Sequence, residues 1–286
     1  MKRAMGAALS CALMALAGCT EGAQETVSFD SAHAATGAVF LETFAGDVVV
    51  DTDPGAIRVA GTILLTARGF PSTDDALAAL HQVEIDESGT AEALEIRVSG
   101  PALRGLRTVR ADLFLSVPPG VLVSALSADG LVSATDIDFD SLETARGGVE
   151  LVATRGPGLV RASGGEIVVD GHEGGLDLRT SDAPISIFAA RGDVRAVTSN
   201  GMISARVVPP AGAELFFATT NAGVDLALPV NFGADLSATT DGDIYIEGLD
   251  FFPTRDSLDL LEGELAGGGG ALDVRTTHAD IRIHRR

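Results

Sequence analysis

"AVTSNGMISA" at residues 196–205 is the stretch that decides the fold, because the chain repeats its pattern several times. It holds a polar turn, Thr198–Ser199–Asn200–Gly201, and then residues that alternate between apolar and polar. Asn-Gly and Asp-Gly supply the positive φ angles of tight turns, so each copy predicts a turn that enters a strand. The other copies are "RTSDAPISI" at 179–187, "ATTNAGVDL" at 218–226, "ATTDGDIYI" at 238–246 and "RTTHADIRI" at 275–283.

The copies recur at a nearly constant interval. Successive turn positions are 17, 18, 18, 18, 21, 20 and 37 residues apart, the last step spanning two periods. An 18-residue unit with two short strands cannot bury its own apolar face, so the copies must stack on one another. The turn positions are Gly130, Gly147, Gly165, Ala183, Gly201, Ala222, Gly242 and Ala279.

This spacing predicts an all-β fold, a β-solenoid (a single-stranded β-helix) whose coils are 18 residues long in the most regular copies, with right-handed winding favoured. A β-sandwich is the alternative, since it too has short strands at regular spacing. The near-constant step and the fixed place of the turn favour the solenoid. Ala183 and Ala279 stand where other copies have glycine, and a positive φ angle would strain them.

A β-rich cap containing one short helix is expected before the repeat. The segment "STDDALAALHQ" at 72–82 has an N-cap candidate in Ser72 or Thr73 and acidic residues in its first turn, which is typical of a helix start. We therefore expect residues 37–122 to form the N-terminal coil and cap of the solenoid.

Residues 123–286 are expected to hold the repeat coils, interrupted by an insertion at 249–270. Four consecutive glycines in this insertion are incompatible with a regular strand. The sequence therefore predicts a tightly turned or flexible excursion before the final coil.

The N-terminus has the pattern of an export signal. Lys2 and Arg3 precede an apolar run over 4–15 that is too short to span a membrane. The run ends in a motif that resembles the lipobox of bacterial lipoproteins, with signal peptidase recognition residues before a cysteine: Leu16, Ala17, Gly18 and Cys19.

The lipobox resemblance implies that residues 1–18 are a lipoprotein signal peptide and that Cys19 carries the lipid. Residues 19–36, which are small and polar, would then form a lipid-anchored tether. The second cysteine, Cys11, lies in the part that is removed, so no thiol would remain for a disulfide or a metal.

The net charge of the chain limits the classes of partner that it can bind. The formal net charge is −20, and it becomes −22 without residues 1–18, which carry Lys2, Arg3 and no acidic residue. Such a surface repels nucleic acid and anionic lipid headgroups, so the membrane contact is expected to run through the N-terminal lipid. Tryptophan is absent and Tyr245 is the one tyrosine, which argues against an aromatic sugar-binding platform.

The repeated Thr-Ser/Thr-Asn/Asp-Gly turn resembles that of the bacterial "putative adhesin" domains, a β-strand-repeat family classed as a domain of unknown function. "LALPVNFGADLSATTDGDIYI" at 226–246 and "LAGGGGALDVRTTHADIRI" at 265–283 are similar to that family's Leu-Pro linker and its glycine-rich entry to a closing repeat. The resemblance covers 37–286. It implies a β-strand-repeat fold and an envelope location, and it brings no catalytic residues.

Two groups of oxygen-bearing side chains are candidate binding sites. Three carboxylates in "TDIDFDS" could bind calcium, although the absence of an EF-hand glycine and distal glutamate favours a solvated strand face: Asp136, Asp138 and Asp140. Side chains at the turns could stack into a ligand-binding ridge, although such residues also cap their own turns. These are Asp129, Asp182, Asn200, Asn221 and Asp241.

No motif points to catalysis. The histidines lack metal-ligand spacing, and no nucleophile elbow, phosphate loop or dinucleotide fingerprint is present. Basic residues that a polysaccharide-cleaving β-helix would need are scattered along the sequence, and the sequence assembles no site from them. These are Arg155, Arg161, Arg179, Arg191, Arg195 and Arg206.

The sequence thus predicts a non-catalytic cell-envelope lipoprotein that presents an adhesin-like β-solenoid as a structural or interaction module, without cofactors. Its partner would be an envelope protein or a glycan. The alternatives are a glycan-binding or polysaccharide-active β-helix protein and an envelope-stress sensor. Thr20 after Cys19 predicts sorting to the outer membrane, on its periplasmic or surface face, if the cell has two membranes.

Overall fold

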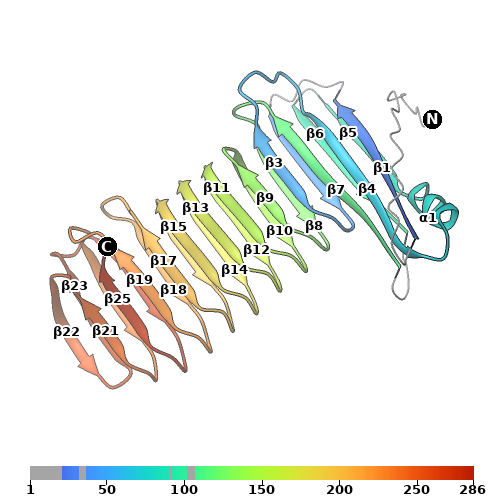
Figure 1. Ribbon diagram of the computed structural model, residues 1–286. Coiled ribbons are helices and arrows are strands. Elements are labelled where there is room, and N and C mark those ends of the chain that lie inside the picture. The colour runs from blue at the N-terminus through green and yellow to red at the C-terminus, as the bar shows by residue number, and fades with distance from the viewer. Residues whose placement is uncertain (1–20, 32–36, 91, 102–106) are drawn as a thin grey trace. The chain divides into compact units, whose positions relative to one another are not determined.

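The computed structural model describes residues 21–31, 37–90, 92–101 and 107–286 (Figure 1). The chain forms two compact units, one up to Ser133 and one from Ala134 onward. Strands make up almost all of the regular structure, so the expected all-β class is confirmed. The signal-peptide residues 1–18 and the lipidation candidate Cys19 lie outside the described residues.

The N-terminal unit has two ladders of hydrogen-bonded strands. In one, with the order β1–β4–β7–β3, the first two pairings are antiparallel and the third is parallel. In the other, with the order β5–β6–β2–β8, only β5–β6 is antiparallel. The strands are β1 (Glu21–Asp30), β2 (Ala38–Thr43), β3 (Val48–Thr52), β4 (Ala60–Phe70), β5 (Glu84–Gly89), β6 (Ala93–Ser99), β7 (Thr108–Val117) and β8 (Leu122–Ser127); β9 (Val132–Thr135) spans the division between the units.

The expected helix is present as α1 (Thr73–Leu80). Its N-cap is Ser72, whose Oγ accepts a hydrogen bond of 3.1 Å from the backbone N–H of Asp75 and donates one of 2.8 Å to the Asp75 carboxylate. Ala76, Ala79 and Leu80 form its buried face. The predicted N-cap and acidic first turn therefore mark the true start of the helix.

The expected tether at 19–36 is wrong where the chain is described. Residues 21–30 form strand β1, which pairs antiparallel with β4 from Glu21–Phe70 to Asp30–Ala60. The segment lacks a strict apolar alternation, and Ala23 is its one buried apolar residue. Its strand structure comes from backbone pairing to the edge of β4, which residue composition does not reveal.

The C-terminal unit is built from two further ladders. Ladder A has the order β10–β12–β14–β16–β18–β24–β20–β23–β22, and ladder B has the order β11–β13–β15–β17–β19–β25–β21. All pairings in ladder B are parallel, as are those in ladder A up to β20. The strands are β10 (Asp138–Thr144), β11 (Val149–Arg155), β12 (Gly158–Ala162), β13 (Ile167–Glu173), β14 (Leu176–Thr180), β15 (Ile185–Arg191), β16 (Val194–Val197), β17 (Ile203–Val207), β18 (Glu214–Ala218), β19 (Val224–Leu228), β20 (Ala234–Thr239), β21 (Ile244–Glu247), β22 (Phe251–Ser257), β23 (Leu260–Leu265), β24 (Gly270–Arg275) and β25 (Ile281–Arg285).

From β10 to β19, each strand pairs with the strand one repeat away, so equivalent residues lie side by side. In ladder A, Leu159 pairs with Asp177 and Asp177 pairs with Arg195. Alternate side chains point inward, and the inward ones are buried aliphatic residues such as Leu178 in ladder A and Ile187 in ladder B. The predicted period-two pattern therefore lines a core inside the unit.

The turn positions also stack, but for a reason other than the one expected. Gly201 does not have a positive φ angle, and neither do Ala183 and Ala279, so these turns carry no left-handed strain. Glycine is needed at 201 because a Cβ atom there would lie 1.8 Å from the carbonyl oxygen of Ala183 in the preceding repeat. The sequence identified the turn correctly and misassigned the role of its glycine.

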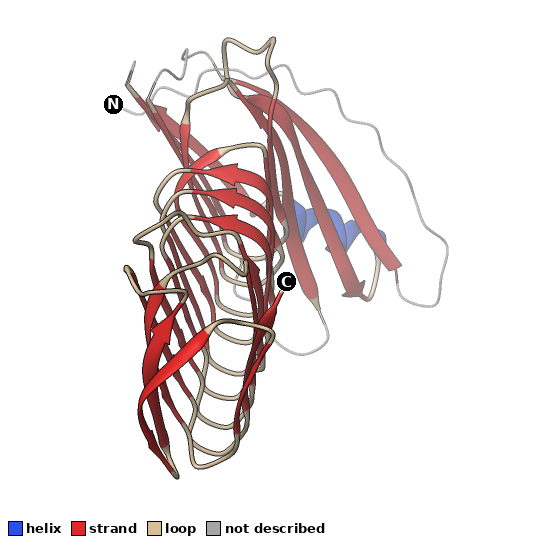
Figure 2. Cartoon of the chain, turned by 90° about the vertical axis from the view of Figure 1, so that its left-hand side faces the viewer, coloured by secondary structure: helices blue, strands red, loops and turns tan. Residues whose placement is uncertain are grey.

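Buried threonine hydroxyls bind the turns to one another. Thr198 donates to the carbonyl of Ala183 (3.1 Å) and Thr219 donates to that of Gly201 (3.0 Å). Thr198 Oγ1 also accepts from the N–H of Gly201 at 3.2 Å. The same donation to a neighbouring turn is made by Thr180, Thr240 and Thr276. This column of hydroxyls gives turn carbonyls a partner inside the unit, where the turns line up in Figure 2.

A second column of bends lies at the other ends of the strands, and the sequence analysis missed it. Gly156, Gly174 and Gly192 have φ angles of +91°, +131° and +135°. Three residues before two of them, Ala153 and Ala189 adopt φ angles of +52° and +58°. These bends recur every 18 residues, so the left-handed angles belong here and not at the Thr-Asn-Gly turn.

The order of strands at the C-terminal end departs from the order of the sequence. The final strands β24 and β25 lie one place inside the stack, between the repeat of β18 and β19 and that of β20 and β21. The expected excursion at 249–270 is mostly an antiparallel hairpin, β22–β23, which pairs with the free edge of β20. Only Ala266 to Gly269 make the expected turn, with φ angles between +46° and +117°. The hairpin ends the parallel stacking of ladder A.

Candidate functional site

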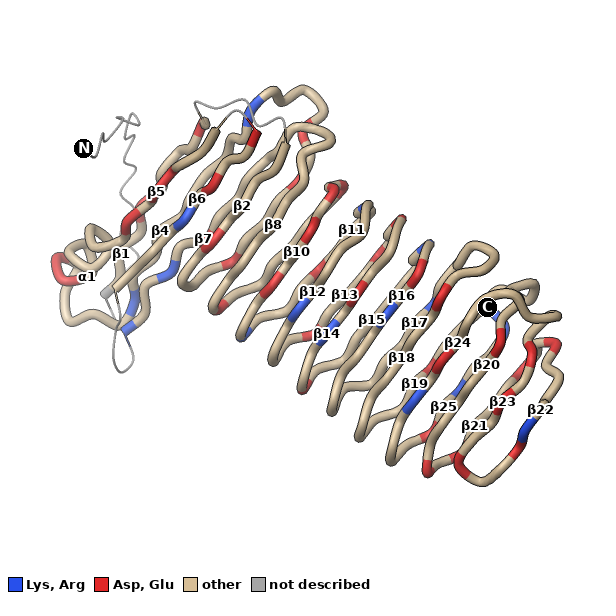
Figure 3. Tube along the Cα trace, turned by 180° about the vertical axis from the view of Figure 1, so that it is seen from behind, with Lys and Arg blue, Asp and Glu red and all other residues tan. Residues whose placement is uncertain are grey.

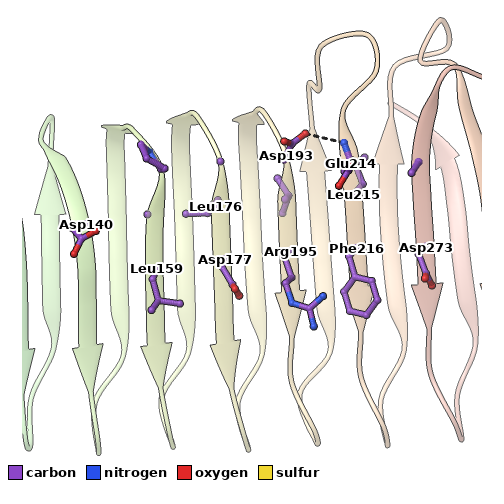
Figure 4. A pocket seen from close by; sticks show the side chains of 15 residues that line it. Asp140, Leu159, Leu176, Asp177, Asp193, Arg195, Glu214, Leu215, Phe216 and Asp273 are labelled. Carbon is purple, nitrogen blue, oxygen red and sulfur yellow. Dashed lines mark hydrogen bonds between the residues drawn. The ribbon is translucent and has the colours of Figure 1, made fainter.

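A groove of about 600 Å³ lies on the outer face of ladder A, in the C-terminal unit. It crosses the first halves of β12, β14, β16, β18 and β24, and Figure 4 shows its side chains. The groove exists because outward positions of successive repeats carry different residues. Leu159, Asp177, Arg195, Phe216 and Asp273 form one lateral row across it.

Arg195 and Phe216 form the centre of the groove. The guanidinium carbon of Arg195 lies 4.2 Å from the ring centroid of Phe216, and that of Arg275 lies 5.5 Å from it. Such cation–π contacts contribute about 0.5–1 kcal/mol each at exposed sites. Within the described part of the chain, Arg195 makes no ion pair, so its N–H donors stay available to a ligand.

The arginines on either side are already paired. Arg179 donates two hydrogen bonds, of 2.9 and 2.6 Å, to Asp177, two residues before it on the same strand. Arg275 binds Asp273 in the same way, because "LDLRT" at 176–180 and "LDVRT" at 272–276 place both residues outward. The hydrogen bond to the neighbouring carboxylate raises the pKa of each arginine. Arg195 also has an aspartate two residues before it, Asp193, but that carboxylate accepts a hydrogen bond from the backbone of Glu214 and makes no ion pair with Arg195.

One rim of the groove is acidic. Asp193 and Glu214 stand two residues before Arg195 and Phe216 in neighbouring repeats, and the Asp193 carboxylate accepts a hydrogen bond of 2.8 Å from the backbone N–H of Glu214. Acidic residues also recur along the other strands of this unit, as Figure 3 shows. The groove therefore combines carboxylates, apolar side chains and the guanidinium group of Arg195 within one face.

The calcium candidates do not form a three-carboxylate cluster. Asp136 lies in a bend with a φ angle of +54°, outside the strand on which we expected it. Its carboxylate lies 2.8 Å from Arg155, and that of Asp138 lies 3.5 Å from the same guanidinium group. Asp140 instead lies at one end of the groove. Among residues 21–31, 37–90, 92–101 and 107–286, no group of three or more acidic, histidine or cysteine side chains is placed to hold a metal ion.

The oxygens of the turn column bind one another. Asn200 Nδ2 donates to Asp182 Oδ1 at 2.6 Å, and Asn221 Nδ2 donates to Asn200 Oδ1 at 2.6 Å. Asp129 belongs to the N-terminal unit, and Asp241 lies in the turn beside residues 277–279. Three of the five predicted residues are therefore joined in a side-chain ladder that stabilises the stack, in place of capping their own turns.

The structure assembles arginines that the sequence left scattered. Arg161 and Arg179 are lateral neighbours in ladder A, and Arg195 lies in the adjacent outward row. Arg155 pairs with the bend at Asp136, and Arg206 lies on ladder B. The 18-residue interval between Arg161 and Arg179 was the available signal, because that interval equals the repeat.

His172 is the buried ionisable group of this unit. It is 1% exposed, its Nδ1 lies 3.0 Å from the hydroxyl of Thr154, and its ring packs edge-on against Phe139 at 5.7 Å. Its Nε2 makes no well-formed hydrogen bond to any described residue. Burial lowers the pKa of His172, and the backbones of Gly175 and Gly156 oppose this to a smaller extent. The imidazole is a core residue and lies outside the groove.

Comparisons with known proteins give two structural likenesses. A crystal structure of "a putative cell adhesion protein" from Clostridium sporogenes aligns over 92% of this chain and 99% of its own, with a TM-score of 0.32 and 10% sequence identity. One of "a putative adhesin" from Bacteroides fragilis aligns over 90% and 96%, with a TM-score of 0.33 and 12% identity. No family model and no curated protein matches the chain. At such values the likeness says nothing about function, which must come from the site.

One further observation bears on location. None of the described residues forms a helix with the length and apolar character needed to cross a membrane.

Proposed function

We propose that the C-terminal unit is a β-solenoid and that it serves as a non-catalytic interaction module of a cell-envelope lipoprotein. The parallel pairing of every ladder B strand, and of ladder A up to β20, supports this proposal. Partner residues are 18 apart from β10 to β17, as coils of that length require. A β-sandwich would pair most of its strands antiparallel.

The observation that carries the interaction role is the Arg195–Phe216 pair in the groove. A guanidinium group held against an aromatic ring is ordered before any ligand arrives, so binding costs it little further conformational entropy. Its N–H fork suits a carboxylate or carbonyl oxygen, the Phe216 ring supplies apolar surface beside it, and Leu159 supplies more two strands away. A protein segment of the envelope that carries such a group is the partner that this surface fits best.

A glycan is the second candidate, and the assembled arginines favour it. Arg161 and Arg179 lie one strand apart in ladder A, and Arg195 follows on the next strand in the adjacent row. Guanidinium groups repeated at the strand spacing of about 4.8 Å could meet carboxylates along an acidic polysaccharide. Arg161 and Arg179 lie outside the lining of the groove and pair with Glu143 and Asp177, so a polymeric ligand would extend beyond the groove and compete with these carboxylates.

We place the protein in the cell envelope, held by lipid on Cys19 and sorted to the outer membrane in cells with two membranes. The sequence motif at 16–19 supports this location. The substitution Cys19→Ala should move the protein from the membrane to the soluble fraction, and cell fractionation measures this shift. Retention of the variant in the membrane would refute the lipid anchor.

The groove is tested with the full chain in detergent, as wild type, Arg195→Ala, Phe216→Ala and Arg206→Ala. Arg206 is a matched control, because it is an exposed arginine on ladder B, away from the groove. Each protein is used to capture ligands from envelope extract and on a glycan array that includes uronate polymers.

We expect both groove variants to lose the wild-type ligand and Arg206→Ala to keep it. If the groove variants no longer capture a protein that the wild type captures from the extract, the partner is a protein. If they no longer bind the uronate spots that the wild type binds, the ligand is a glycan. A binding role for the groove would be contradicted if a ligand bound all four proteins equally. It would also be contradicted if the wild type bound nothing in the extract and nothing on the array.

A further inference from the structure

The last segment of the chain is threaded into the interior of the stack. Strand β24 pairs with β18 on one side and with β20 on the other, and β25 pairs with β19 and with β21. Residues 234–247, which come earlier in the sequence, therefore lie beyond residues 270–285 in the stack. The C-terminal coil (residues 270–286) must enter a slot between two repeats that precede it in the chain.

This coil is a core element and not a loose tail. Its inward side chains Leu272, Val274, Ile281 and Ile283 are at most 1% exposed. Thr276 donates a 2.8 Å hydrogen bond to the carbonyl of Ala222, which ties the coil to the threonine column. Removal of the coil would leave four strand edges and two apolar surfaces facing an empty slot.

A turn at residues 266–269, here called the hinge, connects the coil to the rest of the unit. Ala266, Gly267, Gly268 and Gly269 have consecutive positive φ angles of +46°, +89°, +78° and +117°. No atom lies within 4 Å of a Cβ position built at Gly267 or Gly269, so these two positions face open space, while Gly268 donates a backbone hydrogen bond of 3.0 Å to Leu265. A change of backbone angles at these four residues could redirect the coil, and the strand edges that it leaves would regain their pairing when the coil of another copy enters the slot.

We propose that the slot accepts the C-terminal coil of a second copy of this chain, so that two copies assemble by exchanging residues 270–286. Every contact of the coil is the same in its own slot and in that of the partner copy, so exchange changes only the hinge and the entropy of association. Each copy has one coil and one slot, and the proposed exchange is reciprocal, in that each coil fills the other copy's slot and the assembly closes at two chains.

The exchange would also make the groove a shared site. Asp273 and Ala271, which line the groove, belong to the coil, whereas Arg195 and Phe216 belong to the receiving chain. Each groove of the exchanged pair would therefore contain residues of both copies. This proposal goes beyond the binding role, since it holds whatever the groove binds.

The test uses register partners across the slot. Ser237 on β20 and Asp273 on β24 are lateral neighbours on the outer face, within the reach of a disulfide at the spacing of paired strands. In a full chain with Cys11 and Cys19 changed to serine, Ser237→Cys and Asp273→Cys are made separately. The two proteins are unfolded together, refolded at high concentration and oxidised.

We expect a disulfide-linked pair of unlike chains in the mixture, and several times less cross-linking when either protein is refolded alone. The matched control is a mixture of Ser186→Cys and Ser204→Cys, which are register partners on β15 and β17, outside the coil. That mixture should give no more linked chains than its separate components. Equal cross-linking in the two mixtures would overturn the proposal, provided that a single chain carrying both Ser237→Cys and Asp273→Cys forms its internal disulfide.

The hinge gives a second readout that does not depend on the disulfide. Deletion of Gly267 and Gly268 shortens the path back to the chain's own slot, so the fraction of two-chain species in size-exclusion chromatography should rise severalfold. Insertion of two glycines at the same place should lower it. A deletion variant that stays a single chain with the wild-type melting temperature would overturn the proposal, and if that variant fails to fold, the cross-linking result decides.

Discussion

The hydroxyl of Thr219 donates a hydrogen bond of 3.0 Å to the backbone carbonyl of Gly201, one repeat earlier in the chain. Both residues are buried, so this carbonyl is removed from solvent. Equivalent bonds run from Thr198 to Ala183 and from Thr276 to Ala222. The turn column is thus held by side chains from the neighbouring repeat, and its stability depends on the contacts between repeats.

Replacement of Thr219 by valine should destabilise the C-terminal unit by about 1–3 kcal/mol, because it leaves a buried carbonyl without a donor. Thr219→Ser keeps the hydroxyl and should retain most of the stability. Urea unfolding at neutral pH measures the free energy of unfolding of both variants. Equal unfolding midpoints for the valine and serine variants would show that the hydroxyl is dispensable.

Replacement of Gly201 by valine should damage stability more than ligand binding. Even the first added atom would lie 1.8 Å from the carbonyl oxygen of Ala183, so the backbone must shift, at a cost of about 1–3 kcal/mol or more. Gly164 is the matched control, since a Cβ there meets nothing within 4 Å and its φ angle is not positive. Thermal unfolding should show a large loss for Gly201→Val and little change for Gly164→Ala. An unchanged melting temperature for Gly201→Val would contradict the stacked turn.

Replacement of Ala189 by glycine should stabilise the protein. Ala189 has a φ angle of +58°, a left-handed conformation that costs an L-residue about 1–2 kcal/mol and glycine almost nothing. Ala196, a buried residue of β16 with ordinary strand geometry, is the control, and Ala196→Gly should lose about 0.5–1 kcal/mol. Opposite shifts of the two unfolding midpoints are expected. A loss of stability in Ala189→Gly would show that its methyl group contributes more than the strain costs.

Acid should destabilise the wild type through His172. Burial lowers the pKa of this residue below its ordinary value of 6.5, so the folded state favours the neutral imidazole and the unfolded state binds the proton more readily. The stability that the neutral imidazole contributes is therefore fully present above pH 6.5 and declines as the pH falls below that value. His172→Gln should lose less stability than the wild type between neutral and mildly acidic pH. Parallel pH profiles for the two proteins would place the acid sensitivity elsewhere.

The repeat could be predicted from local chemistry alone. Alternating residues such as Ile185, Ser186 and Ile187 specify a strand with one buried face, and the 18-residue step specifies which strands correspond. Ser72 and the acids after it likewise specified the start of α1. These features depend on residues that are close together in the chain, so the sequence alone reveals their physical cause.

The candidate site was only partly predictable. The sequence singled out Asp136, Asp138 and Asp140, but backbone geometry turns Asp136 into a bend and Arg155 holds two of the carboxylates. It offered no reason to pair Arg195 with Phe216, because those residues are 21 positions apart and meet only through strand register. A groove is a property of neighbouring repeats, and no single repeat encodes it.

By itself, then, the sequence determined the all-β class, the repeat length, the polar turn and the helix. The tertiary structure alone decided that the coil at 270–286 lies between earlier repeats, that Ala153 and Ala189 take the left-handed angles, and that β1 is a strand. The reason is that every repeat presents similar apolar faces and similar backbone edges. Local pattern therefore specifies that a coil must stack, whereas the packing of whole repeats selects its neighbours.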